Sequence, residues 1–254
     1  MKSENNMSEG IVIGRNPVIE LLNAKKNIDF IYVAKGCRTG SIRVALAKAK
    51  EMGITVKEVD NSKLNALCEG QNHQGIIASM ACKNYVSVDD IINNAKEKNE
   101  PPFIIIADGI EDPHNFGAII RTAECVGVHG IIIAKRRSVG LNYTVSKTSA
   151  GAIEYVSVAK VTNIVSTIED LKKRGVWVYG MDMDGETWCS TDLKGPIALV
   201  LGSEGNGISR IVKEKCDGII SLPMLGKINS LNVSVAAGLG MYEVCRQRMG
   251  LKTK

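Results

Sequence analysis

The sequence of 254 residues predicts an α/β fold in two unequal parts, a small domain over residues 1–82 and a larger domain over residues 103–254. Two observations carry this prediction. In the larger part, short continuous apolar runs alternate with helix-like segments, which is typical of a parallel sheet covered by helices on both faces. Between the parts, residues 83–102 are polar and charged and end in Pro101 and Pro102, which indicates a linker.

The smaller part shows its own alternation of helices and strands. Asn16 and Pro17 suit the N-cap and the first position of a helix that ends at Asn23. Residues 1–8 are mostly polar, and we expect them to be disordered. The other elements expected here are helices over 41–53 and 61–68 and strands over 28–34, 55–60 and 75–80.

The larger part contains five short apolar runs that we interpret as strands buried on both faces of a sheet. They are residues 103–108, 130–134, 176–181, 197–202 and 218–223. Helices are expected over 88–98 within the linker and over 115–126, 163–174, 209–216 and 231–249. Because ligands bind at the carboxyl ends of strands in such sheets, we expect a site in the loops that follow Asp108, Gly202 and Pro223.

The charge of the chain permits a nucleic-acid partner without requiring one. There are 32 Lys and Arg residues against 27 Asp and Glu, a formal net charge of +5. The tightest basic cluster is Lys135–Arg137. The sequence leaves two interpretations of it equally open, a solvated strand end and a phosphate contact.

The composition disfavours disulfide, metal and membrane classes. The seven cysteines are scattered without a C-x-x-C pair, and the three histidines show no paired spacing, so no disulfide framework and no metal site is expected. Free thiols are typical of a reducing cytosol. No apolar run approaches the length of a membrane span, and the first ten residues lack the apolar core of a signal peptide. We therefore expect a cytoplasmic protein with no membrane contact.

The loop after Asp108 places an asparagine and an arginine near a helix start. Asn115 can cap that helix, and Arg121 lies six residues further on, beyond the first turn. An ordinary cap and an exposed helix arginine explain both residues, so neither indicates chemistry by itself.

Three glycines and a glutamate follow the apolar run of residues 197–202. Gly202, Gly205 and Gly207 allow positive φ or a close approach of the backbone to a ligand. Their spacing is not the dinucleotide fingerprint, and no G-K-[ST] follows, so the loop indicates either a cofactor without phosphates or only a tight turn. Glu204 in such a loop is less easily explained as a solvated carboxylate.

Small polar side chains gather where the last helix is expected to begin. Ser230, Asn232 and Ser234 cluster there, which is more than the one cap that a helix needs. Small residues at 236–238 and 240 follow, and they indicate that other backbone passes very close. The helix itself is indicated by apolar residues at three- and four-residue spacing, namely Leu231, Val235, Leu239 and Tyr242.

Three blocks in this order, DPHNFGAIIRTAECVGVHGIII, IALVLGSEGNGIS and ISLPMLGKINSLNVSVAAG, resemble the three motifs of the SpoU (TrmH-type) branch of the SPOUT methyltransferases. The resemblance covers residues 103–250. The first part, including NHQGI at 72–76, is similar to the small RNA-binding domain that precedes the catalytic domain in ribosomal RNA guanosine-2′-O-methyltransferases of this family. The runs HNFGAIIRTAE and SLNVSVAAG fit the RlmB-type subgroup, which modifies a guanosine of 23S ribosomal RNA.

The resemblance implies a fold, a cofactor and an assembly. The C-terminal segment of the family threads through a loop to form a deep trefoil knot, a rare exception among protein folds. S-adenosylmethionine binds in that knot, and the proteins are homodimers whose site borrows from both chains. Carried over onto this sequence, the cofactor-binding residues are Gly202, Glu204, Gly207, Leu222, Met224 and Leu231.

The resemblance also implies catalytic residues and needs no metal. The matching positions are Asn115, Arg121, Glu204, Ser230 and Asn232. The family's proposed proton acceptor corresponds to Arg121, but an arginine with a pKa above about 12 is a poor base. Arg121 is better suited to holding a phosphate, and Glu204 is the chemically easier proton acceptor.

Two alternatives remain beside a ribosomal RNA enzyme. One is a transfer-RNA 2′-O-methyltransferase of the same family. The other is a non-catalytic RNA-binding ribosome factor on the same scaffold, which the joint presence of Asn115, Arg121, Glu204 and Asn232 argues against. A nucleotide-binding oxidoreductase is disfavoured because the phosphate fingerprint is absent.

Overall fold

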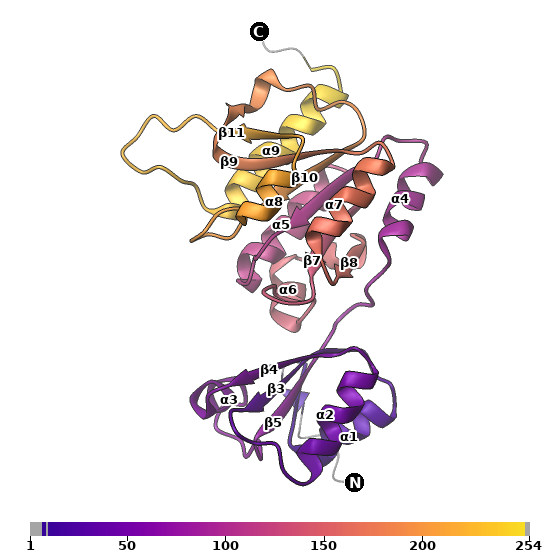
Figure 1. Ribbon diagram of the computed structural model, residues 1–254, viewed down its shortest axis with the longest axis vertical. Helices are drawn as coiled ribbons and strands as arrows, with labels where there is room; N and C mark the ends of the chain where they lie inside the picture. Colours follow the sequence, from indigo (N-terminus) through magenta and orange to yellow (C-terminus); the bar gives the residue numbers. More distant parts are fainter. Residues whose placement is uncertain (1–6, 9, 252–254) are drawn as a thin grey trace. The chain divides into compact units, whose positions relative to one another are not determined.

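The computed structural model describes residues 7–8 and 10–251, and these form two compact units. One unit contains the residues up to Asn84 together with Gly140–Ser146, and the other contains Tyr85–Val139 and the residues from Lys147 onward. Figure 1 shows the elements of each unit along the chain.

The first unit is a mixed five-stranded sheet with helices on both faces. Its strand order is β1-β2-β5-β3-β4, and only β3 and β4 pair in parallel. The strands are β1 (Met7–Ser8), β2 (Ile11–Ile13), β3 (Ile28–Ala34), β4 (Thr55–Val59) and β5 (Ile76–Met80). The helices are α1 (Arg15–Asn23), α2 (Ser41–Glu51) and α3 (Asn61–Leu67). α1 and α2 pack in one apolar cluster and α3 in another, so β3 is buried on both faces.

Two details of the N-terminal prediction were wrong. The first helix begins at Arg15 with Gly14 as its N-cap, so Asn16 lies inside the helix. Gly14 takes φ +99, a conformation that glycine adopts without a Cβ penalty, and this lets the chain turn directly from β2 into α1. Met7–Ser8, expected to be disordered, pair with β2 as strand β1. Residues 1–6 lie outside the described residues.

The second unit is a six-stranded, all-parallel sheet in the order β11-β9-β10-β6-β7-β8. The strands are β6 (Phe103–Ala107), β7 (Gly130–Ala134), β8 (Val158–Val161), β9 (Trp177–Thr187), β10 (Ile197–Leu201) and β11 (Gly218–Ser221). Its α-helices are α4 (Val88–Glu97), α5 (Pro113–Cys125), α7 (Ile164–Lys173), α8 (Arg210–Lys215) and α9 (Val233–Arg248). A further helix, α6 (Tyr143–Thr148), follows β7 in the chain, and most of it belongs to the segment Gly140–Ser146 of the first unit. Two short 3₁₀ helices, η1 (Ala152–Glu154) and η2 (Trp188–Ser190), complete the described elements.

The five predicted strands are confirmed, and two features of the sheet were not predicted. β8 was missed because its four residues include Lys160 and do not form a continuous apolar run. β9 continues to Thr187 through polar residues, beyond the predicted end at residue 181, because its far end pairs with β11 after a bulge.

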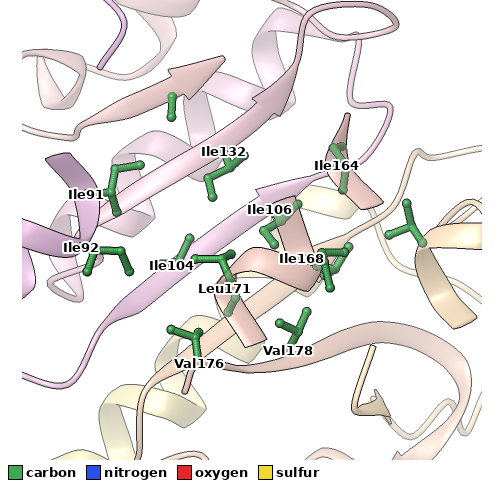
Figure 2. Close-up of a cluster of buried hydrophobic side chains, with 14 of the residues drawn as sticks. Ile91, Ile92, Ile104, Ile106, Ile132, Ile164, Ile168, Leu171, Val176 and Val178 are labelled. Carbon is green, nitrogen blue, oxygen red and sulfur yellow. The ribbon is translucent and has the colours of Figure 1, made fainter. Parts of the chain in front are cut away.

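One face of this sheet is covered by α4, α7 and α8. Their apolar side chains pack with strand residues in a single buried cluster, which Figure 2 shows around Ile91, Ile104 and Ile168. The predicted linker of residues 83–102 therefore contains a helix of the second unit. Ile91 and Ile92 are buried, but most residues of this segment are polar, and this is why the sequence indicated a linker.

α9 lies on the opposite face, and its glycines explain part of its composition. A Cβ on Gly240 would stand 2.4 Å from the sulfur of Met181, so the side chain of Met181 on β9 occupies the space that glycine leaves on α9. The helix begins at Val233, two residues later than predicted, with Asn232 as its N-cap. The apolar stripe that predicted this helix is its exposed side, including Val235, Leu239 and Tyr242. The trefoil knot stays a prediction.

Within the part of the chain that the structure describes, no helix combines the length and apolar character needed to span a membrane.

Candidate active site

Three loops meet at the carboxyl edge of the parallel sheet, after β6, β10 and β11, and two cavities lie among them. The larger cavity, of about 480 Å³, is lined by the loop after β6, by Ala134, Arg136 and Arg137, and by the loop after β10. The smaller cavity, of about 420 Å³, is lined by the ends of β9 and β11 and the segment before α9. Ser203–Gly207 and Val233 line both cavities. Both cavities lie at the strand ends where the sequence predicts a site, and their function stays a prediction.

Asn115, Glu204 and Asn232 form a hydrogen-bonded polar cluster at the wall that the two cavities share. Nδ2 of Asn115 donates to Oε1 of Glu204. Nδ2 of Asn232 donates to Oδ1 of Asn115 at 3.0 Å and to Oε1 of Glu204 at 3.5 Å. Asn115 is buried while Glu204 is exposed, so two amides orient a carboxylate that solvent and ligands can reach. An exposed, oriented carboxylate can accept a proton from a bound group.

Local helix geometry fixes two members of this cluster. Asp112 is the N-cap of α5 and accepts from the backbone of His114 and Asn115, with Pro113 at the first helical position. The prediction that Asn115 caps this helix was therefore wrong, because an aspartate three residues earlier takes that place. Asn232 does cap α9, since its Oδ1 accepts from the Ser234 backbone N–H at 2.9 Å.

The loop after β10 closes on itself. Ser203 and Gly207 exchange two backbone hydrogen bonds of 2.9 Å, and Gly207 has φ +63. A Cβ on Gly202 would lie 2.1 Å from the backbone carbon of Gly207. We expected Gly202 to provide positive φ or space for a ligand, and the structure corrects this: the loop's own backbone fills that space.

The smaller cavity contains every predicted cofactor-binding residue. These are Gly202, Glu204, Gly207, Leu222, Met224 and Leu231, and the predicted catalytic residue Ser230 lines it too. Its ionisable lining residues are Asp182 and Glu204, and no Lys, Arg or His is among the described residues that form its wall. A cavity with two carboxylates and no cation suits a positively charged ligand without phosphates.

Asp182 was missed by the sequence prediction. It stands at the polar end of β9, which the apolar pattern did not identify as strand. Its carboxylate lies 3.1 Å from the ammonium of Lys213 on α8. Burial lowers the pKa of Lys213, but its hydrogen bonds to Asp182 and Asp184 outweigh burial and raise that pKa above its ordinary value. Lys213 therefore stays charged and fixes Asp182 at the cavity wall.

Two predicted catalytic residues, Ser230 and Arg121, are not part of the cluster: Ser230 lines the smaller cavity, and Arg121 stands apart. It is exposed on α5, and it lines neither the larger nor the smaller cavity. Arg136 and Arg137, by contrast, line the larger cavity. The sequence marked them only as part of a basic cluster, because the cavity they line is formed by loops from distant parts of the chain.

Among the described residues, no group of three or more His, Cys, Asp or Glu side chains could hold a metal ion. The polar and charged groups described at the site are the polar cluster, the two carboxylates of the smaller cavity and the two arginines of the larger one.

Comparison with known proteins gives consistent matches over both units. Residues 102–242 match the model described as the SpoU rRNA Methylase family, and residues 11–86 match the one described as RNA 2′-O ribose methyltransferase substrate binding. A putative TrmH family tRNA/rRNA methyltransferase, YacO of Bacillus subtilis, is 50% identical over 238 residues, which are 93% of this chain and 95% of the relative. A protein of the same description from Staphylococcus haemolyticus is 45% identical over 95% of this chain and 97% of its own.

The fold is also shared with solved structures. The SpoU methyltransferase AviRb from Streptomyces viridochromogenes, solved in complex with AdoMet, superposes with a TM-score of 0.60 over 94% of this chain and 90% of that chain. An AdoMet-bound rRNA methyltransferase from Sinorhizobium meliloti superposes with a TM-score of 0.59 over 96% and 88%. Each is 22% identical to this chain, so the likeness shows a common fold.

Proposed function

Because the chain belongs to the SpoU rRNA methylase family, we propose that it transfers a methyl group from S-adenosylmethionine to the ribose 2′-hydroxyl of a guanosine in 23S ribosomal RNA. The family establishes the coarser statement, that the chain is an RNA methyltransferase that uses S-adenosylmethionine. The polar cluster of Asn115, Glu204 and Asn232, placed where the two cavities meet, is the observation that supports the proposed methyl transfer to a hydroxyl group.

The smaller cavity fits the cofactor. S-adenosylmethionine is a sulfonium cation without phosphates, and this cavity combines two carboxylates, apolar side chains and exposed backbone without a basic side chain. Leu222, Met224 and Leu231 would hold the cofactor together with the backbone of Ser203–Gly207. When bound, it supplies a methyl group to an acceptor oxygen as its carbon–sulfur bond breaks.

Glu204 has the role of proton acceptor in this proposal. The ribose 2′-hydroxyl is a weak nucleophile, so its proton must leave as the oxygen–methyl bond forms. Oε1 of Glu204 is held by the amides of Asn115 and Asn232, which orients the carboxylate toward the shared wall. Ser230, which lines the smaller cavity, positions the ribose and the cofactor. Ser230 and the two asparagines contribute by orienting the reacting groups rather than by transferring protons.

Arg121 enters the site from a second copy of the chain. It is exposed on α5 and lines neither cavity of its own chain. On α9, the exposed fractions of Val235, Leu239 and Tyr242 are 51%, 39% and 56%, and these residues form an apolar stripe that association would bury. We therefore propose a homodimer in which the arginine binds a phosphate of the RNA held by its partner.

We prefer ribosomal RNA over transfer RNA because the chain carries a substrate-binding unit before its methylase domain. Residues 11–86 match the family model for RNA substrate binding. Transfer RNA remains the second candidate, since the relatives' descriptions name both RNA classes. The polar cluster disfavours the non-catalytic alternative, because a protein that only binds RNA needs no oriented carboxylate. We place the reaction in the cytoplasm, in keeping with the free cysteines.

The experiment compares 2′-O-methyl sites in total RNA from cells with and without this protein. The proposal predicts that one guanosine of 23S ribosomal RNA loses its methyl group and that a plasmid copy restores it. A plasmid copy with Glu204→Gln should not restore it. A site lost from transfer RNA instead would select the second candidate, and an unchanged map would reject both.

A further inference from the structure

We propose that Arg136 and Arg137 form a clamp for the phosphate beside the target nucleotide, and that this clamp holds the nucleotide in the larger cavity. The inference rests on the proposed function and deepens it. It assigns a binding role to two residues that lie outside the predicted catalytic set. It also separates the two cavities by ligand: the sulfonium cofactor in the smaller one and the RNA in the larger one.

Both guanidinium groups are available for a ligand. Arg136 and Arg137 are exposed and line the larger cavity. In the described part of the chain, neither side chain makes a hydrogen bond or an ion pair, whereas Arg174 and Arg246 are engaged by carboxylates. Since a guanidinium has five N–H donors in a planar fork, two free ones that line the same cavity suit the oxygens of a phosphate.

The backbone that carries the clamp is fixed. The Lys135 N–H donates to Val161 at 2.8 Å, and the Val139 N–H donates to Ile110 at 2.9 Å, so both ends of the turn are anchored to the sheet and the loop after β6. The buried Ser138 hydroxyl donates to the Ala134 carbonyl. Between these anchors Arg137 adopts φ +54, a left-handed conformation that a non-glycine residue keeps only when its surroundings enforce it.

The charges of the larger cavity favour a nucleotide over a free anion. Its lining includes four carboxylates, those of Asp108, Glu111, Asp112 and Glu204, against two guanidinium groups. A small isolated phosphate would be repelled by this net negative lining. A nucleotide can place its phosphate at the arginines while its ribose hydroxyl and base N–H groups face the carboxylates.

Three of the four carboxylates already accept hydrogen bonds from the protein. Asp108 accepts from the Ser209 N–H at 2.8 Å, and Asp112 accepts from the first turn of α5. Glu204 is held by the two asparagine amides. A ribose bound between Arg136–Arg137 and Glu204 would lie next to the wall that this cavity shares with the smaller one, where the methyl donor is expected.

The test measures methyl transfer and RNA binding with the full chain. Wild type is compared with Arg136→Ala/Arg137→Ala, with Arg136→Lys/Arg137→Lys, and with the control Lys96→Ala/Lys173→Ala. The control removes two exposed cations from the ends of α4 and α7, which precede β6 and β9 and so lie at the amino edge of the sheet. The substrates are large-subunit RNA and ribosomal subunits from cells without the protein, titrated at several salt concentrations.

We expect the alanine pair to raise KM for RNA by roughly 10- to 100-fold with kcat within a few-fold of wild type, and to reduce the slope of log affinity against log salt by about one. S-adenosylmethionine affinity, measured by calorimetry, should stay within a few-fold. The lysine pair should keep the wild-type salt slope but lose part of the affinity, because it preserves charge without the planar fork.

Two outcomes would overturn the inference while leaving the proposed function intact. One is that the Arg136→Ala/Arg137→Ala pair has the same KM and salt slope as the Lys96→Ala/Lys173→Ala control. The other is an alanine pair that loses kcat at an unchanged KM, since the arginines would then act in the chemical step. A wild-type protein that methylates neither substrate would instead overturn the proposed function, so the two failures are distinguishable.

Discussion

Asn232 donates from its Nδ2 to the Oδ1 of Asn115 at 3.0 Å, across 117 residues of sequence. The same side chain caps α9 through its Oδ1. One residue thus ties the start of the last helix to the first turn of α5, and both asparagines donate to Glu204. The orientation of the Glu204 carboxylate therefore depends on the starts of two helices that are far apart in the sequence.

Asn232→Asp should separate the two roles of this residue. The carboxylate can still accept from the Ser234 N–H and cap α9, so the melting temperature should stay close to that of wild type. It can no longer donate, and it places a second negative charge beside Glu204. We expect methyl transfer to fall by about 100-fold or more, which is a loss of roughly 3 kcal/mol of transition-state stabilisation. Radiolabel transfer to RNA measures this, and near-normal turnover would show that the amide is dispensable.

Arg121→Ala and Glu204→Gln should each abolish activity as homodimers and complement each other when mixed. If Arg121 serves the partner's site, each mixed dimer keeps one intact site. Random assortment makes half of the dimers mixed, so about a quarter of wild-type activity should return. The measurement is methyl transfer after the two inactive variants are unfolded and refolded together. No recovered activity would mean that Arg121 acts within its own chain or not at all.

Gly202→Ala should disrupt the loop after β10, whereas Gly205→Ala should not. A Cβ at position 202 would collide with the backbone of Gly207 and Ile208, and a Cβ at position 205 meets no atom within 4 Å. We expect Gly202→Ala to lower S-adenosylmethionine affinity by more than about tenfold and to reduce thermal stability. Calorimetric titration of both variants tests this, and tight cofactor binding by Gly202→Ala would contradict the loop geometry.

Ile91→Ala should destabilise the second unit if α4 belongs to its core. Ile91 is fully buried, and its side chain fills the space where a Cβ on Gly130 would be. Removing it should cost about 2–5 kcal/mol of the free energy of unfolding. Asn93→Ala, an exposed change on the same helix, is the control and should cost little. Equal denaturant midpoints for the two variants would mean that residues 83–102 are only a tether.

His129 should make folding stability depend on pH. Its Nδ1 accepts from the Phe103 N–H at 3.0 Å and its Nε2 lies 3.1 Å from Glu100. Burial lowers the pKa of this imidazole below its ordinary value, and the hydrogen bond to Glu100 only partly opposes that effect. The unfolded chain therefore binds a proton more readily, so this contribution is complete above about pH 6.5 and is lost as the pH falls through that value.

Urea unfolding between about pH 5 and 8 measures this contribution. We expect His129→Asn to reduce the decline of stability toward acid. His114→Asn, which changes an exposed histidine, should keep the wild-type slope. A slope that is unaltered in His129→Asn would show that another group causes the pH dependence.

The parts of the fold that were predictable from sequence are those in which burial leaves a local signal. Strands such as β6 and β10 are buried on both faces, so they appear as continuous apolar runs and place the site at their carboxyl ends. The end of β9 carries mostly polar residues and is defined by its pairing with β11, so its prediction stopped short. The helix α4 was predicted, but its packing against the sheet was not, because Ile91 and Ile92 stand among polar residues.

Some residues of the candidate site were likewise predictable from sequence, and others were not. Asn115, Glu204 and Asn232 were found because motifs of the family contain them, although the expected cap at Asn115 belongs to Asp112. Asp182, Arg136 and Arg137 become visible as lining residues only when distant loops form the cavities. The stripe of Val235, Leu239 and Tyr242 shows the limit of periodicity, which identifies an apolar face but not what covers it.

The central claim is tested most directly by incubating the purified full chain with S-adenosylmethionine that carries a deuterated methyl group. The substrate is total RNA from cells that lack the protein. Mass spectrometry of nucleosides and oligonucleotides then locates the label. The account predicts labelled 2′-O-methylguanosine at one position of 23S ribosomal RNA, and none with Glu204→Gln. Label on a base, or label confined to transfer RNA, would contradict it.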